Sequence, residues 1–547
     1  MKKARGGPGD SSFLILLIIL ADQIAIRLAI ICHTGPFTDQ GLYGDDSYIS
    51  HKLAANIAAG DGITQAGTPT NGFQPLFVFL LVPFYWFLDI YQATVASALM
   101  NSLFSVGGSL LVFLILKDLL SVRAGLIGMA LWALSEYLTR VCLNGMETSL
   151  ANSMMLAVIY GHIRSVRTLI PMSRVRGAGL GVVMGLALLA RFDLGLLLLP
   201  LGIDQLRVRT RRREWTALAS LTAAAALVVM PWFLWSHVVC GSLMPVSGQA
   251  GRTISQLYGS AAGPQQNPDY FPPGQVPLSF YGDNVSAAVE RVISDSPINI
   301  PVRALAANGS WVCGLWMAAW LLAGWMLSRK CTEGRTLMGD LRVLLGRLWF
   351  LWAFVPMLMS AYCFYFFAQW HFWRYMTPVV VALILPTAVC VDHVWAWAGG
   401  GALARWAVLA PVAFAFLIAG TRDHLRFFAP PDEGIAYRIY HDAVKLRSFV
   451  TPDMRIGSFE SGTLDYFLDV DVFNLDGKTN AMAYRELVAG RMDRLVETLH
   501  LDYVVSSPPL IRDLLIRRGR WSPGRLRVVD KLSHNVILKV DRDASKR

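Results

Sequence analysis

The sequence predicts a polytopic α-helical membrane protein with a soluble α/β domain at its C-terminal end. Of the 547 residues, 54% are hydrophobic and only 16% are charged, and the mean hydropathy is +0.45. Soluble domains carry about 25% charged residues, so the composition excludes a soluble protein. The apolar residues gather in segments close to the roughly 17–25 residues that cross a bilayer, and these segments end near residue 420.

Charge and cysteine content narrow the function classes. The net charge of +11 does not indicate nucleic-acid binding, because Lys and Arg are concentrated in short loops between apolar segments. Basic residues in such loops mark the cytoplasmic side of a membrane protein. The seven cysteines show neither paired spacing nor a metal-binding pattern, so we interpret them as small buried residues. The apolar run 13–31 follows a basic N-terminus without a cleavage site, which predicts an uncleaved signal anchor.

Eleven apolar segments are predicted to span the membrane, and a twelfth is not. Residues 75–88 form an apolar segment of 14 residues with two prolines, which predicts an interfacial or re-entrant segment. Counting it as a span would place the later basic loops outside, against the positive-inside rule. The predicted spans are 12–32, 93–116, 124–140, 148–163, 176–190, 193–206, 216–238, 308–328, 346–367, 375–395 and 403–420.

With eleven spans and the N-terminus inside, every unusual polar residue falls on the outer side. The outer segments include a first outer loop at 33–92 and a long outer loop at 239–307 that is rich in Gly, Pro, Ser and Asn. We expect the long loop to form a lid with a short helix near 284–294. The predicted division is a transmembrane catalytic domain of residues 1–420 and a periplasmic α/β domain of residues 421–547.

The tail after residue 420 alternates short apolar runs with amphipathic segments. Residues 437–450 and 481–500 show helical periodicity. Four short runs predict strands, at 455–459, 471–474, 503–506 and 536–540.

Adjacent carboxylates, Asp45 and Asp46, follow the first apolar span. Charged groups beside lipid are costly, and capping a helix at 47–59 would require only one of them. We expect the pair to act as a general base or a cation ligand. Glu147 opens a later span from the same side and is the candidate second carboxylate, although the helix dipole alone also favours an acid there. Asp45, Asp46 and Glu147 could bind a divalent cation such as Mg²⁺ or Mn²⁺, but no dense ligand motif is present.

Other polar residues of the outer side are candidates for substrate binding. An Asn–Gln pair could hold a sugar hydroxyl or position the Asp pair. An Arg–Asp pair between two short apolar runs could be an anion clamp or a structural ion pair. A cationic cluster with aromatic neighbours suits a phosphate, and one arginine of the long loop could contribute. The predicted substrate-binding residues are Asn71, Gln74, Arg191, Asp193, Arg252, His371, Arg374 and Tyr375.

These residues combine carboxylates and cations at one rim of a helical bundle. Carboxylates suit deprotonation of an acceptor hydroxyl. Cations suit binding a phosphate and stabilising it as a leaving group. The combination predicts transfer of a sugar from a lipid-phosphate carrier.

Three segments of the first outer loop, 44–50, 55–62 and 71–76, form a recognisable pattern together with the segments 144–148, 190–193, 374–378 and 474–480 elsewhere in the chain. In this pattern the chain resembles GT-C-fold membrane glycosyltransferases, in particular the bacterial arabinofuranosyltransferase-like subset. The resemblance implies a polyprenyl-phosphate sugar donor, an outer-loop Asp as general base with Asp45 as the better candidate, and Glu147 as the second acid. It also implies first-loop helices that lie on the membrane.

The predicted function is therefore glycosyl transfer, inverting or retaining, at the outer face of the bacterial cytoplasmic membrane. The donor sugar would be a pentofuranose such as arabinose, or a hexose, and the acceptor a glycan, lipid or protein of the cell envelope. Alternatives are a lipid-linked glycan transporter or flippase, and a polysaccharide polymerase or ligase. A transporter would need polar residues or broken helices near the bilayer midplane, whereas the predicted spans are apolar through their middles.

The charge asymmetry makes a testable prediction of topology. Single cysteines introduced at positions 60, 280 and 480 should react with a membrane-impermeant thiol reagent added outside. A cysteine at position 120 should react only after the membrane is opened. Labelling of position 120 from outside would contradict the eleven-span arrangement.

Overall fold

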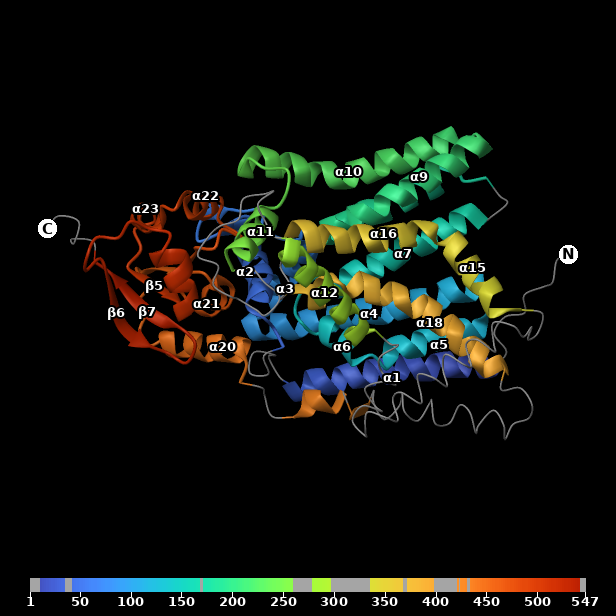
Figure 1. Cartoon of the computed structure of the whole chain (residues 1–547), viewed down its shortest axis with the longest axis horizontal. Coiled ribbons are helices and arrows are strands. Elements are labelled where there is room, and N and C mark those ends of the chain that lie inside the picture. Colours follow the sequence, from blue (N-terminus) through green and yellow to red (C-terminus); the bar gives the residue numbers. More distant parts are fainter. Residues whose placement is uncertain are drawn as a thin grey trace.

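The computed structural model describes residues 10–34, 42–167, 171–258, 278–296, 335–366, 371–397, 421–422, 424–429 and 433–541. Within these residues, long helices form a bundle at one end of the elongated molecule, and a mixed α/β region lies at the other end (Figure 1). The helices of the first outer loop lie between the two parts. The chain is mostly helical, as the sequence predicts.

Four helices of the described residues are long and apolar enough to cross a membrane. A fifth span results if α15 (Leu337–Arg347) and α16 (Trp349–Ala361), which are bent by 72° at their junction, are counted as one. The four are α1 (Asp10–Thr34), α4 (Ile90–Leu119), α10 (Trp215–Cys240) and α18 (Thr377–Trp397).

The count of eleven spans is not confirmed. Residues 308–328 and 403–420, two of the predicted spans, lie outside the described residues. The predicted span 124–140 is divided at Ser135, whose side chain accepts a hydrogen bond from the backbone N–H of Leu138 and so starts a new helix. The remaining segments form α5 (Val122–Ala133), α6 (Glu136–Cys142), α7 (Thr148–Arg167), α8 (Arg174–Ala190) and α9 (Gly195–Arg212).

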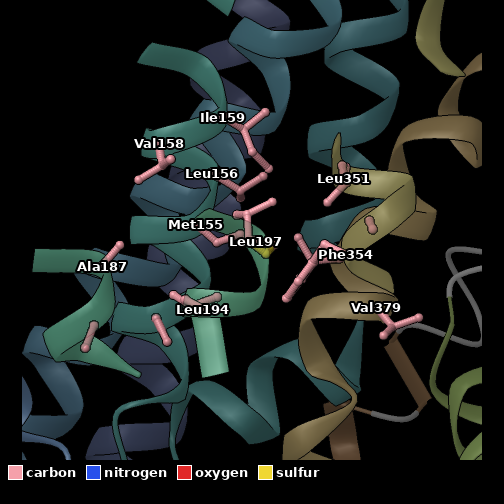
Figure 2. Close-up of a cluster of buried hydrophobic side chains, with 14 of the residues drawn as sticks. Met155, Leu156, Val158, Ile159, Ala187, Leu194, Leu197, Leu351, Phe354 and Val379 are labelled. Carbon is pink, nitrogen blue, oxygen red and sulfur yellow. The ribbon is translucent and has the colours of Figure 1, made fainter. Parts of the chain in front are cut away.

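Apolar side chains from several helices fill the centre of the bundle. Figure 2 shows Met155 and Leu156 of α7 together with Leu197 of α9 and Phe354 of α16. All four side chains are buried. Burial of this kind stabilises helices that are too short or too broken to be independent spans.

The first outer loop folds into two helices joined by a small hairpin. Helix α2 (Asp45–Ala59) ends at Gly60, and the paired strands β1 (Thr64–Gln65) and β2 (Thr68–Pro69) lead to α3 (Pro75–Phe87). Pro75 starts α3, where its fixed φ suits the first helical position. Helix α3 has 13 residues, so it is shorter than a span, as expected for the segment 75–88.

The C-terminal region contains a five-stranded sheet in the order β4-β3-β5-β7-β6. Strand β3 is parallel to β4 and β5, whereas β7 is antiparallel to β5 and β6. The strands are β3 (Arg455–Ser458), β4 (Asp471–Asn474), β5 (Tyr503–Ser506), β6 (Leu526–Lys531) and β7 (Val536–Val540), and the main helices are α20 (Ile435–Leu446), α21 (Ser461–Phe467), α22 (Ala481–Ala489) and α23 (Met492–Thr498).

The four predicted strands are confirmed, and β6 was missed. Most of the β6 side chains are exposed, and charged residues interrupt its apolar ones, so the segment gives only a weak strand signal. The predicted helix 481–500 is two helices, because Gly490 has a φ of +65° and ends α22. Helix α11 (Val246–Tyr258) lies at the end of the bundle that faces this region, and α12 (Leu278–Asp295), which includes the helix expected near 284–294, lies alongside the bundle (Figure 1). The short helix α17 (Phe372–Tyr375) directly precedes α18 in the chain. The division at residue 420 stays a prediction.

Two glycines bring the first outer loop and the α/β region into backbone contact. A Cβ atom added to Gly72 would lie 1.9 Å from the carbonyl oxygen of Lys478. A Cβ added to Gly462 would lie 2.0 Å from the carbonyl oxygen of Asp45. No other residue fits at either position without moving one backbone away from the other. The position of Lys478 is therefore set by direct contact with the first outer loop.

We expect Gly72→Ala to separate the two parts and to lower stability by about 1–3 kcal/mol, the usual cost of an overpacked contact. Gly44→Ala is the matched control, because a Cβ added at Gly44, in the same loop, meets nothing within 4 Å. Thermal unfolding of the purified variants measures the difference. Equal stability of the two variants would contradict the close contact.

Candidate active site

A cavity of about 550 Å³ lies where the bundle, the first outer loop and the α/β region meet. Apolar side chains form much of its wall, and its polar side chains come from segments that are distant in the sequence. Those polar or titratable residues include Asp46, Gln74, Glu147, Arg191, Asp193, His371, Arg374, Tyr375 and Lys478. The structure thus brings most of the predicted site residues together at one place.

Asp46 lies at the centre of a cationic cluster. One carboxylate oxygen accepts a hydrogen bond from Nη2 of Arg374 at 2.7 Å, and the other accepts one from Nζ of Lys478 at 3.2 Å. Nε2 of His371 is 3.8 Å from the first oxygen. Burial raises the pKa of Asp46, but the charges of Lys478 and Arg374 outweigh burial and hold this pKa well below its usual range. The carboxylate is therefore ionised and fully engaged.

Asp45 points away from the cavity, although it is adjacent to Asp46. Its carboxylate accepts hydrogen bonds from the backbone N–H groups of Gly462, at 3.2 Å, and Thr463, at 2.7 Å. These N–H groups belong to the first turn of α21 and have no partner within their own helix. Burial raises the pKa of Asp45 to about 7. The structure thus places Asp46, rather than Asp45, where it can meet a substrate.

Arg191 and Asp193 form a structural ion pair at the edge of the cavity. The guanidinium of Arg191 donates to both carboxylate oxygens of Asp193 and to the hydroxyl of Tyr362. Its Nη1 also donates to the backbone carbonyl oxygen of Arg374, at 3.4 Å. Because the side chain of Arg191 is occupied by these partners, its geometry favours support of Arg374 over a free anion clamp.

Glu147 is the cavity-lining carboxylate with the fewest partners. Its side chain is buried, with 7% of the residue exposed, and it makes neither a hydrogen bond nor an ion pair with the described residues. Asp46 and Asp193, in contrast, are both paired with cations. Glu147 is therefore able to accept a hydrogen bond from a bound hydroxyl.

The remaining predicted binding residues divide between the cavity and its supports. Gln74 lines the cavity, and its buried Oε1 has no partner in the described part of the chain. Asn71 instead holds the α10–α11 connection, because it donates to Ser236 and accepts from the N–H of Val246. Arg252 does not line the cavity; its guanidinium lies over the ring of Tyr365, 4.4 Å from the centroid.

His371 directly precedes α17, Tyr375 is the last residue of α17, and both line the cavity together with Arg374. Tyr375 stacks on Tyr362 with the ring centroids 4.5 Å apart. Burial and the positive charge of Arg374 hold the pKa of His371 well below its usual value. His371 is therefore neutral at physiological pH and adds hydrogen-bonding capacity, while the positive charge comes from Arg374 and Lys478.

Lys478 is the site residue that the sequence analysis missed. It follows β4 in a loop shaped by Gly477, which has a φ of +85°, and by Asn474, whose Oδ1 accepts from the N–H of Gly477. Burial lowers the pKa of Lys478, but Asp46 and Asp476 outweigh burial and keep it above its usual value. The segment 474–480 contributes to the family resemblance, but nothing in the sequence indicates that it reaches the first outer loop.

The carboxylates do not fit a metal site. Asp45 is turned toward α21, and Asp46 is surrounded by cationic side chains that would repel a metal ion. In the described ranges, no group of three His, Cys, Asp or Glu side chains is arranged to hold a metal ion. The possible Mg²⁺ or Mn²⁺ stays a prediction.

Comparison with known proteins shows likeness in structure rather than in sequence. No protein-family model matches the chain, and no curated protein sequence matches it. The crystal structure of ArnT from Cupriavidus metallidurans bound to undecaprenyl phosphate is similar with a TM-score of 0.57 and 14% identity, over 98% of this chain and 99% of that chain. The Archaeoglobus fulgidus oligosaccharyltransferase, in complex with Zn and sulfate, is similar with a TM-score of 0.52 and 13% identity, over 91% of this chain and 68% of that chain.

At these identities the likeness establishes the fold alone. The fold resembles that of GT-C membrane proteins, as the first outer loop implies, and the protein is a multi-pass membrane protein with a C-terminal α/β region. The arabinofuranosyltransferase-like subset is not confirmed.

The raised pKa of Asp45, about 7, predicts how pH affects the contact between α2 and α21. In the unfolded chain the pKa of an aspartate is about 4. The contribution of Asp45 to the stability of this contact is therefore fully present below about pH 4 and is lost as pH rises through about 7. Asp46 has a lowered pKa, so its contribution is lost only as pH falls below about 4. Between about pH 5 and 8, we therefore expect protection of the α21 amides from hydrogen exchange to decrease.

Asp45→Asn is the control for this pH dependence. The variant should weaken the pH dependence of α21 amide protection without abolishing it. Asp465 lies in the same interface, and burial raises the pKa of Asp465 to about 6. If α21 amide protection in Asp45→Asn depends on pH as strongly as in the wild type, Asp45 is not the group that titrates.

Proposed function

We propose that the protein transfers a sugar from a polyprenyl-phosphate carrier to an acceptor hydroxyl. The observation that carries this proposal is the ionised carboxylate of Asp46 between Arg374 and Lys478, in a cavity where the bundle meets the α/β region. The fold shared with ArnT, solved with undecaprenyl phosphate, and with an oligosaccharyltransferase supports the same chemistry.

Arg374 and Lys478 bind the phosphate of the donor, because charge-assisted hydrogen bonds suit phosphate oxygens. The acceptor oxygen forms a bond to the anomeric carbon as the bond from that carbon to the phosphate oxygen breaks. The electron pair leaves with the phosphate, whose growing charge the two cations stabilise. The acceptor proton passes to Asp46, the general base. Glu147 orients the acceptor by accepting a hydrogen bond from a hydroxyl group.

The reaction takes place at the outer face of the bacterial cytoplasmic membrane, with the active site and the α/β region facing the periplasm. The cations of the cavity suit a phosphate group, which supports a lipid-phosphate donor, and the sugar is a pentofuranose such as arabinose or a hexose. The acceptor is a glycan, lipid or protein. Product formation serves cell-envelope glycan synthesis.

Asp46→Asn should reduce turnover by roughly 10²–10⁴-fold, because an amide cannot take up the acceptor proton. The assay follows radiolabelled sugar from a polyprenyl-phosphate donor into membrane acceptors. Asp45→Asn is the matched control, one residue away and outside the cavity, and should retain most activity. A loss in Asp45→Asn with near-normal turnover in Asp46→Asn would remove Asp46 as base, and a loss confined to Glu147→Gln would transfer that role to Glu147.

A further inference from the structure

The two oxygens of the Asp46 carboxylate contact two different cations. Arg374 donates to one oxygen at 2.7 Å, and Lys478 donates to the other at 3.2 Å. Two oxygens of a phosphate group could take the same two hydrogen bonds, since phosphate and carboxylate share this mode of recognition. The carboxylate therefore occupies the position in which these cations would hold a phosphate.

Arg374 has more donors than its partners use. A guanidinium carries five N–H donors. Its Nε is buried without an acceptor in the described residues, and Nη1 meets only the sulfur of Met146, a weak acceptor. Only 6% of Arg374 is exposed, so water does not readily satisfy these donors. An anion with more oxygens than a carboxylate would fit this guanidinium better.

Carboxylates already match the positive charges of the cluster. Arg374 and Lys478 supply two positive charges, while Asp46 and Asp476, which is 3.5 Å from Lys478, supply two negative ones. Glu147 adds a further carboxylate to the same cavity. A phosphate that entered beside an unmoved Asp46 would place like charges in contact, which is unfavourable.

We propose that the donor phosphate and the Asp46 carboxylate compete for Arg374 and Lys478, and that the phosphate displaces the carboxylate when the donor binds. This inference rests on the proposed function. The carboxylate of Asp45 holds the start of α2 against α21, because it accepts hydrogen bonds from two backbone N–H groups of α21. The competition therefore requires movement of the Asp46 side chain only.

Displacement has a consequence for the order of events. The cations that lower the pKa of Asp46 are then engaged by the phosphate, so the carboxylate becomes a stronger base. Asp46 thus becomes able to take the acceptor proton only after the donor is in place. When the donor is absent, the Asp46 carboxylate stays paired with Arg374 and Lys478 and is a weak base toward the acceptor.

The test is the affinity of the purified protein for undecaprenyl phosphate in detergent. Asp46→Asn removes the competing charge, so we expect it to bind this lipid about 10-fold or more tightly than the wild type, the scale of one charge-assisted hydrogen bond. Lys478→Met should bind more weakly. Asp46→Glu keeps a competing carboxylate and should not bind more tightly than the wild type.

Asp45→Asn is the matched control at about pH 8, where Asp45 also carries a negative charge. It removes that charge one residue away and outside the cavity, and its affinity should stay within about twofold of the wild type. Equal tightening in Asp45→Asn and Asp46→Asn would overturn the proposal, because the effect would then be one of net charge.

Unchanged or weaker binding by a folded Asp46→Asn would also overturn the competition, while leaving the proposed function intact if turnover is still lost. If Asp46→Asn fails to fold, the other two variants decide. Tighter binding by Asp46→Glu would overturn the proposal. Weaker binding by Lys478→Met, with no tightening by Asp46→Glu, would support it. Absence of binding and of sugar transfer in the wild type would instead refute the proposed function.

Discussion

The ion pairs of Asp46 with Arg374 and Lys478 join three parts of the chain that are far apart in the sequence. Asp46 lies in the first turn of α2, Arg374 lies on the short helix before α18, and Lys478 follows a strand of the C-terminal region. None of these parts could form the site alone. The cavity depends on the α/β region being held against the first outer loop, which the glycine contacts at positions 72 and 462 allow.

Two adjacent aspartates show how environment separates the roles of identical side chains. Asp45 meets backbone N–H groups, and burial raises its pKa, whereas cations outweigh burial at Asp46 and lower its pKa. Consecutive residues at a helix start point in different directions. One aspartate therefore joins two parts of the structure, and the other faces the cavity. The Arg191–Asp193 pair likewise supports Arg374 through its backbone.

The sequence predicted a mostly helical membrane fold with a C-terminal α/β region, though the count of eleven spans is not confirmed. It also predicted four of the five described tail strands and the gathering of Asp46, Glu147, His371 and Arg374, because composition, alternation and side-chain chemistry are local signals. It did not predict which of Asp45 and Asp46 faces the cavity, since the partners of Asp45 lie more than 400 residues away. Lys478 was missed for the same reason. Strand β6 was missed because charged residues interrupt its few apolar ones, as suits an exposed strand.

The most direct test of this account is an experimental structure of the protein with bound undecaprenyl phosphate. We expect the phosphate oxygens to lie within about 3 Å of the nitrogens of Arg374 and Lys478, the distance of a charge-assisted hydrogen bond, with the Asp46 side chain turned away from both. A phosphate bound elsewhere, with Asp46 still paired to Arg374 and Lys478, would contradict the account.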